Sequence, residues 1–301
     1  MEQLINCDSG NSKLAKTTGE TVGFRVAGLG LSPYTYGGRG NLCPSAGACV
    51  HTCVLRECGR MVMKNVRAAG ERKTNLFFDD RKGFIAQVKS DIKRVTKTST
   101  RRGLKQSIRL NVATDLPFES IDRSIFTDNP TVSFYDYTKI AKRALNAHKL
   151  PKNYELTYSY SENSKNSELI DILEAGNNVA VITDTYYWAG NMAKIPTSVN
   201  IDGKVFKTVD GDLHDYRLKD IDGVGVVVIL RGKGGRAKVA AAVNDGFMLE
   251  DTGSAQLQIP TDSERLTQKG IGISTRRFNA QDPIELTISA SDKSTLAIAA
   301  A

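Results

Sequence analysis

The feature that constrains the fold most is a regular alternation of short apolar runs and helix-compatible segments after residue 106. The runs cover residues 107–113, 132–137, 154–160, 178–183 and 224–230, and residues 137–150 and 166–175 have helical patterns. The polar positions that follow the first four runs, 115, 139, 161 and 184, are 24, 22 and 23 residues apart. Repeated strand–helix units of this length build parallel sheets with helices outside. We therefore predict an α/β fold, first a (β/α) barrel that is incomplete or carries insertions, and alternatively an open doubly wound sheet.

The segments on either side of this repeat complete the predicted organisation. Residues 21–29 are a candidate first strand, 30–59 a structured loop, and 60–69 and 83–96 amphipathic helices. Residues 199–209 predict a hairpin around Asp202-Gly203, which we interpret as an insertion. We expect a catalytic domain over residues 1–250, with a cysteine-rich loop at 43–58 and basic helices at 60–105. Residues 251–301 form a C-terminal extension without an assigned role.

Length and hydropathy exclude several classes of protein. A chain of 301 residues buries a large core without needing a disulfide or a metal ion. The sequence contains no apolar run long enough to span a membrane and no signal-peptide pattern. We therefore expect a cytoplasmic protein with no membrane partner.

Positive charge is concentrated between Arg60 and Lys105. This stretch has fourteen Lys or Arg and four Asp or Glu, an excess of ten, whereas the whole chain has a net charge of +8. Such a surface attracts polyanions, so we expect DNA as a partner, and a solvated helical face is the alternative. The candidate phosphate-binding residues are Arg67, Arg72, Lys73, Arg101 and Arg102.

Four of the five cysteines lie within sixteen residues. Cys43, Cys49, Cys53 and Cys58 are spaced C-x5-C-x3-C-x4-C, and Cys7 lies apart. Thiolates bind zinc and iron–sulfur clusters, and ligands within one loop converge easily. We predict that these four cysteines bind metal, zinc or an iron–sulfur cluster; buried unliganded thiols are the alternative.

Polar residues follow each predicted strand. Because sites in α/β proteins lie at the carboxyl ends of strands, these residues are candidates for chemistry, although Asp and Asn also cap helices. The candidate catalytic residues are Asp115, Asp136, Lys139 and Asp184. The candidate substrate-binding residues are Glu119, Ser161, Glu162, Asn163, Arg231 and Lys233.

Several motifs resemble a family of bacteriophage gene products over residues 10–250, which implies a phage protein acting in the host cytoplasm. They are residues 42–49 (LCPSAGAC), 110–111 with Asp115, 134–139 (FYDYTK), 153–157 (NYELT) and 210–212 (DGD). More remotely, the chain resembles phage relatives of tRNA-guanine transglycosylases, which exchange guanine in DNA for a 7-deazaguanine base. This resemblance implies a (β/α)8 barrel, zinc held by the cysteines, and Asp115 as the acid that reads or protonates the base. The nucleophile is then Asp184 or Asp136.

The sequence departs from the transglycosylase pattern in two ways, and these departures favour other functions. Asp115 is followed by Leu116-Pro117-Phe118 instead of Ser-Gly-Gly-Phe, and the cysteines lie in an N-terminal loop with wide spacing. The position of the loop resembles radical S-adenosylmethionine enzymes, partial barrels whose first strand is followed by three cysteines that bind a [4Fe-4S] cluster. We thus expect base exchange in DNA first and radical chemistry on nucleic acid second. A noncatalytic DNA-binding protein with structural zinc is the third possibility.

Overall fold

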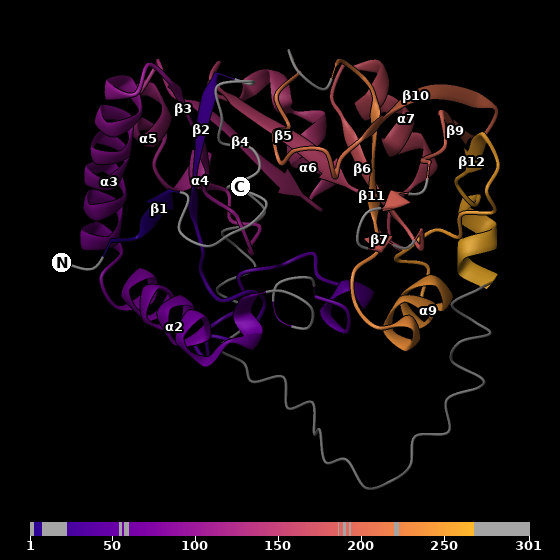
Figure 1. The fold of residues 1–301 in the computed structure, drawn as a ribbon, viewed down its shortest axis with the longest axis horizontal. Coiled ribbons are helices and arrows are strands. Elements are labelled where there is room, and N and C mark those ends of the chain that lie inside the picture. Colours follow the sequence, from indigo (N-terminus) through magenta and orange to yellow (C-terminus); the bar gives the residue numbers. More distant parts are fainter. Residues whose placement is uncertain are drawn as a thin grey trace, which may run out of the picture.

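The fold is built on one large mixed sheet (Figure 1). The computed structural model describes residues 3–7, 23–53, 56, 60–185, 187–188, 191–192, 194–219 and 223–267, and the statements below concern these residues. The sheet has ten strands in the order β1-β2-β3-β4-β5-β6-β11-β10-β9-β12. In that order the strands are β1 (Ile5–Cys7), β2 (Phe24–Leu29), β3 (Lys105–Arg109), β4 (Ser133–Thr138), β5 (Tyr154–Ser159), β6 (Val179–Thr183), β11 (Val227–Arg231), β10 (Lys204–Asp210), β9 (Ser198–Ile201) and β12 (Gln256–Gln258). Strands β7 (Tyr187–Trp188) and β8 (Asn191–Met192) form a separate antiparallel pair.

The predicted alternation of strands and helices is confirmed. The strands from β2 to β6 are parallel neighbours in sequence order, and β11 and β10 continue the parallel sheet. The helices include η1 (Ala48–Val50), η2 (Arg60–Val62), α2 (Lys64–Asp79), α3 (Arg81–Arg101), α4 (Phe118–Ile121), α5 (Ser124–Thr127), α6 (Ala141–Leu145), η3 (Ala147–Lys149), α7 (Asn166–Glu174) and α9 (Arg236–Asn244). The two basic helices are longer than the sequence predicted, since α2 and α3 meet at Asp80, which caps α3 through the Gly83 N–H.

The sheet is open, so a barrel is not shown. Strand β1 pairs with the outer edge of β2 and runs antiparallel to it. At the other end, the β9–β12 pair forms the edge of the sheet. Closure would require β2 to pair with a strand from the far end of the sheet, and β1 already uses the hydrogen-bonding groups of that edge.

The hairpin at residues 199–209 is confirmed, but it extends the main sheet. Strands β9 and β10 pair antiparallel, and β10 pairs parallel with β11. Asp202 and Gly203 both have positive φ, 47° and 88°, as a tight two-residue turn requires. Residues 256–258 of the predicted C-terminal extension form β12 and therefore belong to the sheet. Residues beyond 267 lie outside the described part of the chain.

The two faces of the sheet are covered differently. On one face, α3 packs its apolar stripe, with Phe84, Val88 and Ile92, against β2 and β3. On the other face, here called the inner face, Tyr216 and Leu218 pack against Phe24, Val26 and Tyr135. Within the described ranges, no helix is both long and apolar enough to cross a membrane.

Candidate functional site

The cysteine loop and the carboxyl ends of three strands enclose one cavity of about 210 Å³. We call it the thiol cavity. The loop after β2 contributes three thiols, and the ends of β3, β4 and β5 contribute polar side chains. Its lining includes Tyr34, Tyr36, Cys43, Cys49, Thr52, Cys53, Arg109, Asn111, Asp115, Tyr137, Thr138, Lys139, Ser159 and Phe247. The structure thus brings Asp115 and Lys139, two of the predicted catalytic residues, to the same cavity as three predicted metal ligands.

Contacts with two strand ends hold the cysteine loop in place. The Cys43 thiol accepts a hydrogen bond from the Tyr34 N–H at 3.2 Å and donates one to the Ala113 carbonyl at 3.5 Å. Beyond β5, Glu162 Oε1 accepts a hydrogen bond from the Ala48 N–H at 2.9 Å, in the short helix that contains Cys49. A Cβ at Gly47 would lie only 1.9 Å from that oxygen, so a larger residue there would displace the Glu162 carboxylate from this position.

The Cys43 thiol lies in an environment that keeps it neutral without a bound cation. Burial raises the pKa of Cys43 to about 12; the Tyr34 N–H lowers it, and the negative charges of Asp115, Cys53 and Cys49 raise it further. A metal ion reverses this balance because it stabilises the thiolates. Across the described ranges, no three Cys, His, Asp or Glu side chains are grouped closely enough to hold a single metal ion. Cys58 lies outside the described residues.

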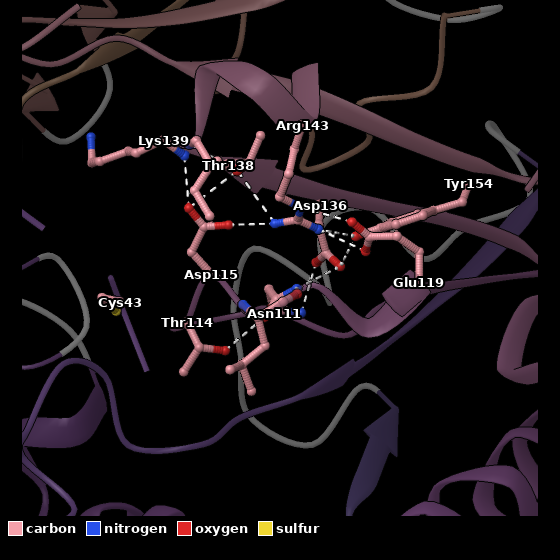
Figure 2. A network of polar contacts seen from close by, with 12 residues as sticks. Cys43, Asn111, Thr114, Asp115, Glu119, Asp136, Thr138, Lys139, Arg143 and Tyr154 are labelled. Carbon is pink, nitrogen blue, oxygen red and sulfur yellow. Dashed lines mark hydrogen bonds and ion pairs between the residues drawn. The ribbon is translucent and has the colours of Figure 1, made fainter. Parts of the chain in front are cut away.

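Asp115 is fixed by a network of hydrogen bonds and ion pairs (Figure 2). Its carboxylate contacts Arg143 Nη1 at 2.6 Å, the Lys139 N–H at 2.8 Å and the Thr138 hydroxyl at 3.2 Å. Arg143 also binds both oxygens of Glu119, at 2.8 and 2.9 Å. Burial raises the pKa of Asp115, and the positive charge of Arg143 lowers it. Glu119 therefore supports the site through Arg143 and does not line the cavity.

Asp136 lies in the protein interior, behind the lining of the cavity, and its carboxyl accepts hydrogen bonds from other buried residues. Its carboxyl is fully buried and accepts hydrogen bonds from the Asn111 N–H at 2.7 Å, Asn111 Nδ2 at 3.2 Å and the Tyr154 hydroxyl at 3.1 Å (Figure 2). Burial raises its pKa to about 7. Asp136 is not part of the cavity lining. Its contacts order Asn111, which does line the cavity.

Lys139 places a positive charge beside the thiols. Its Nζ donates to the Tyr160 carbonyl at 3.2 Å and to the Ser159 hydroxyl at 3.3 Å, and it lies 4.7 Å from the centre of the Phe247 ring. Burial lowers the pKa of Lys139, whereas the negative charges of Cys49, Glu162 and Asp115 raise it. This arrangement suits a site that accumulates negative charge.

The other predicted site residues lie outside the thiol cavity. Asp184 accepts a hydrogen bond from the Asp251 N–H at 2.7 Å, beyond β6. Arg231 binds both oxygens of Asp210, and Lys233 forms an ion pair with Asp212 at 3.3 Å. Near β5, the Asn163 N–H contacts the Ser161 hydroxyl at 3.4 Å, and Asn163 Nδ2 contacts Glu162 at 3.1 Å.

The predicted phosphate-binding residues separate into buried and exposed groups. Lys73 is buried, and its ammonium donates to the Leu4 carbonyl at 2.8 Å, so it is committed to the fold. Arg67 donates to the Met61 carbonyl at 3.3 Å, just before its own helix. Arg72, Arg101 and Arg102 are exposed.

The sequence analysis missed two arginines of the site. Arg109 lies at the end of β3, lines the cavity, and forms an ion pair with Asp215 at 3.3 Å. Its guanidinium lies 4.7 Å from the centre of the Tyr137 ring. Arg143 lies in α6, right after the strand-end motif at 134–139. Arg109 could have been identified from the sequence, because it is a charged residue within a predicted strand that is otherwise largely apolar.

Comparison with known proteins assigns the chain to a protein family. No curated protein and no solved structure matches the chain. A family model described as Gene product 88 matches residues 4–247, most of the 301 residues. That range contains the whole thiol cavity and every strand of the sheet except β12. The chain therefore belongs to this phage gene-product family.

Proposed function

We propose that this protein is an iron–sulfur enzyme of the radical S-adenosylmethionine type that acts on nucleic acid. One observation carries the proposal. The three cysteines of the loop that follows the first parallel strand, Cys43, Cys49 and Cys53, line the same cavity as Asp115 and Lys139. That loop lies at the carboxyl ends of parallel strands that are neighbours in sequence order.

The number of thiols in the cavity, three, favours a cluster with one open iron over a zinc site closed by four thiolates. Thiolates around one zinc ion lie about 2.3 Å from the metal and so must group tightly. A [4Fe-4S] cluster is also held by thiolates, and three of them line the cavity. Three thiolates would leave one iron of a [4Fe-4S] cluster open to the cosubstrate, to which the cluster supplies an electron.

The protein's own residues have three roles in this proposal. Lys139 offsets the negative charge of the thiolates. The aromatic side chains of Tyr34, Tyr36 and Phe247 line the cavity and exclude water from it. Asp115, fixed by Arg143, offers a hydrogen-bond acceptor in a defined position.

Base exchange in DNA is the second candidate, and Asp115 is the observation that favours it. Its carboxylate lines the cavity, where it would contact a base. A covalent mechanism also needs a nucleophile there, and the two candidates, Asp136 and Asp184, are outside the lining. We therefore rank base exchange in DNA second, after the iron–sulfur proposal.

The two candidates differ in metal content. We expect protein purified without oxygen to be brown and to contain about four irons with sulfide per chain. Cys43→Ala, Cys49→Ala and Cys53→Ala should each lose most of the iron. Cys7→Ala, in β1, is the matched control and should keep it, as should Cys58→Ala if three thiolates suffice.

Other metal contents would overturn the proposal. About one zinc per chain with no visible absorption would favour the transglycosylase or a structural zinc site, and a base-exchange assay would then separate these two. Full iron content in all three cavity variants would place the cluster elsewhere.

A further inference from the structure

The outer face of α3 carries a row of positive charges. Lys93, Lys97 and Arg101 are four residues apart and exposed, and we call them the α3 ladder. Residues at this spacing lie above one another on a helix. The opposite side of the helix is the buried stripe that includes Val88, Ile92 and Val95. The ladder therefore points away from the sheet.

Repulsion among the three charges of the ladder destabilises α3 when no anion is bound to it. Like charges four residues apart destabilise a helix. The acid within α3, Asp91, is buried and accepts hydrogen bonds from the Leu4 and Ile5 N–H groups and from Arg94. Lys89, one turn before the ladder, does pair with Asp122 at 2.7 Å. No acidic partner of the ladder is found in the part of the chain that the structure describes, so its charges remain available to an external anion.

The ladder runs from the middle of α3 to its last residue, Arg101, at the end of the sheet opposite the thiol cavity. Helix α3 follows α2, which lies beside the cysteine loop, and it ends where β3 begins at Lys105 (Figure 1). The cavity lies at the other end of β3. Lys105 is exposed and adds a positive charge at this amino edge. A ligand that binds here does not enter the cavity.

We propose that the α3 ladder binds the phosphate backbone of duplex DNA without reading its sequence. From Lys93 to Arg101 the ladder spans about 12 Å, at 1.5 Å per residue. A duplex offers one negative charge per about 1.7 Å of its axis, so several phosphates lie within reach. No large apolar side chain of α3 is exposed, which favours a polyanion over a lipid surface. The proposal does not depend on the metal or the chemistry of the cavity.

The test compares two variants that lose the same charge. The ladder variant is Lys93→Gln/Lys97→Gln/Arg101→Gln. The control is Lys142→Gln/Lys149→Gln/Lys152→Gln, three lysines that are also exposed but lie beyond β4. Binding of the full-length proteins to a fluorescent 30-base-pair DNA is followed by anisotropy at several salt concentrations.

We expect the ladder variant to bind at least tenfold more weakly at about 0.1 M salt. The slope of log K against log salt should fall by about 3, because about 0.9 counterion is released per phosphate contact. Its melting temperature should be unchanged or higher, because repulsion along the helix is removed. Unfolding therefore cannot produce the expected loss of affinity. The control should change affinity less than twofold.

Three results would overturn the proposal. One is a wild-type protein that does not bind DNA, and another is an equal loss in both variants, which would reflect net charge alone. The third is tighter binding of a duplex RNA of the same length, which would assign the surface to RNA. Metal content is measured on the same preparations, so failure here is distinguishable from failure of the iron–sulfur proposal.

Discussion

Gly47→Ala tests how the cysteine loop is held. The added Cβ would lie 1.9 Å from Glu162 Oε1, so the carboxylate must move. That movement breaks its hydrogen bonds with the Ala48 N–H at 2.9 Å and with Asn163 Nδ2 at 3.1 Å. Hydrogen bonds to a charged group contribute about 1.5–3 kcal/mol each, and partial rehydration returns some of this. Because the displaced oxygen is at the end of a flexible side chain whose other oxygen, Oε2, is buried without a hydrogen-bond partner among the described residues, we expect the free energy of unfolding to fall by only about 1–2 kcal/mol.

Urea denaturation followed by circular dichroism measures this change, and a double-mutant cycle assigns its cause. In a Glu162→Ala background there is no carboxylate to displace, and the remaining neighbour, Asn163 Nδ2 at 3.1 Å, has to move by only a few tenths of an ångström, so Gly47→Ala should cost less than about 0.5 kcal/mol. Gly30→Ala is the matched control, because its added Cβ would meet no atom within 4 Å. It should be neutral or slightly stabilising. Equal effects of Gly47→Ala in both backgrounds would refute the argument.

The remaining predictions concern the buried network. Burial raises the pKa of Asp136 from 3.8 to about 7, so the folded protein binds a proton there that the unfolded chain releases. The free energy of unfolding should therefore fall as the pH rises from about 4 to 7, by up to about 4 kcal/mol. Asp136→Asn should remove this part of the pH dependence in urea titrations, and an unchanged profile would contradict the assignment. Arg143→Met leaves Asp115 and Glu119 buried without their cation, at a cost of about 3–5 kcal/mol. Calorimetry should show a melting temperature lower by about 10 °C, and a shift below about 2 °C would mean that the pairs contribute little.

The sequence predicted the strands well because their burial is continuous. The runs at 132–137, 154–160 and 178–183 became β4, β5 and β6, displaced by at most one residue at either end. Parallel strands covered on both faces are rich in apolar, aromatic and β-branched residues, which is a strong local signal. The edges of the sheet were not predictable in the same way. Strand β1 has three residues, and its pairing with β2 depends on contacts that its own sequence does not encode.

The sequence predicted some residues of the site but not which of them line the cavity, and the difference has a physical reason. The cysteines and Asp115 were found because thiols and strand-end acids carry a recognisable local pattern. Whether a polar strand-end side chain lines the cavity or supports a layer behind it depends on the pleat and on distant residues. Asp136 and Lys139 are three positions apart, yet Asp136 accepts hydrogen bonds from Asn111 and Tyr154 in the interior, whereas Lys139 lines the thiol cavity.

The inner face of the sheet is covered by a segment that comes late in the sequence, and this order affects how the chain folds. Tyr216 and Leu218 pack on Phe24 and Val26, about 190 positions earlier in the sequence. Contacts at such separation form late, because a very long loop must close before they are gained. During synthesis, β2 to β6 emerge well before the segment that covers them, so the nascent sheet exposes apolar surface. A chain shortened before residue 216 should consequently aggregate, even though it retains the cysteine loop and most of the parallel strands.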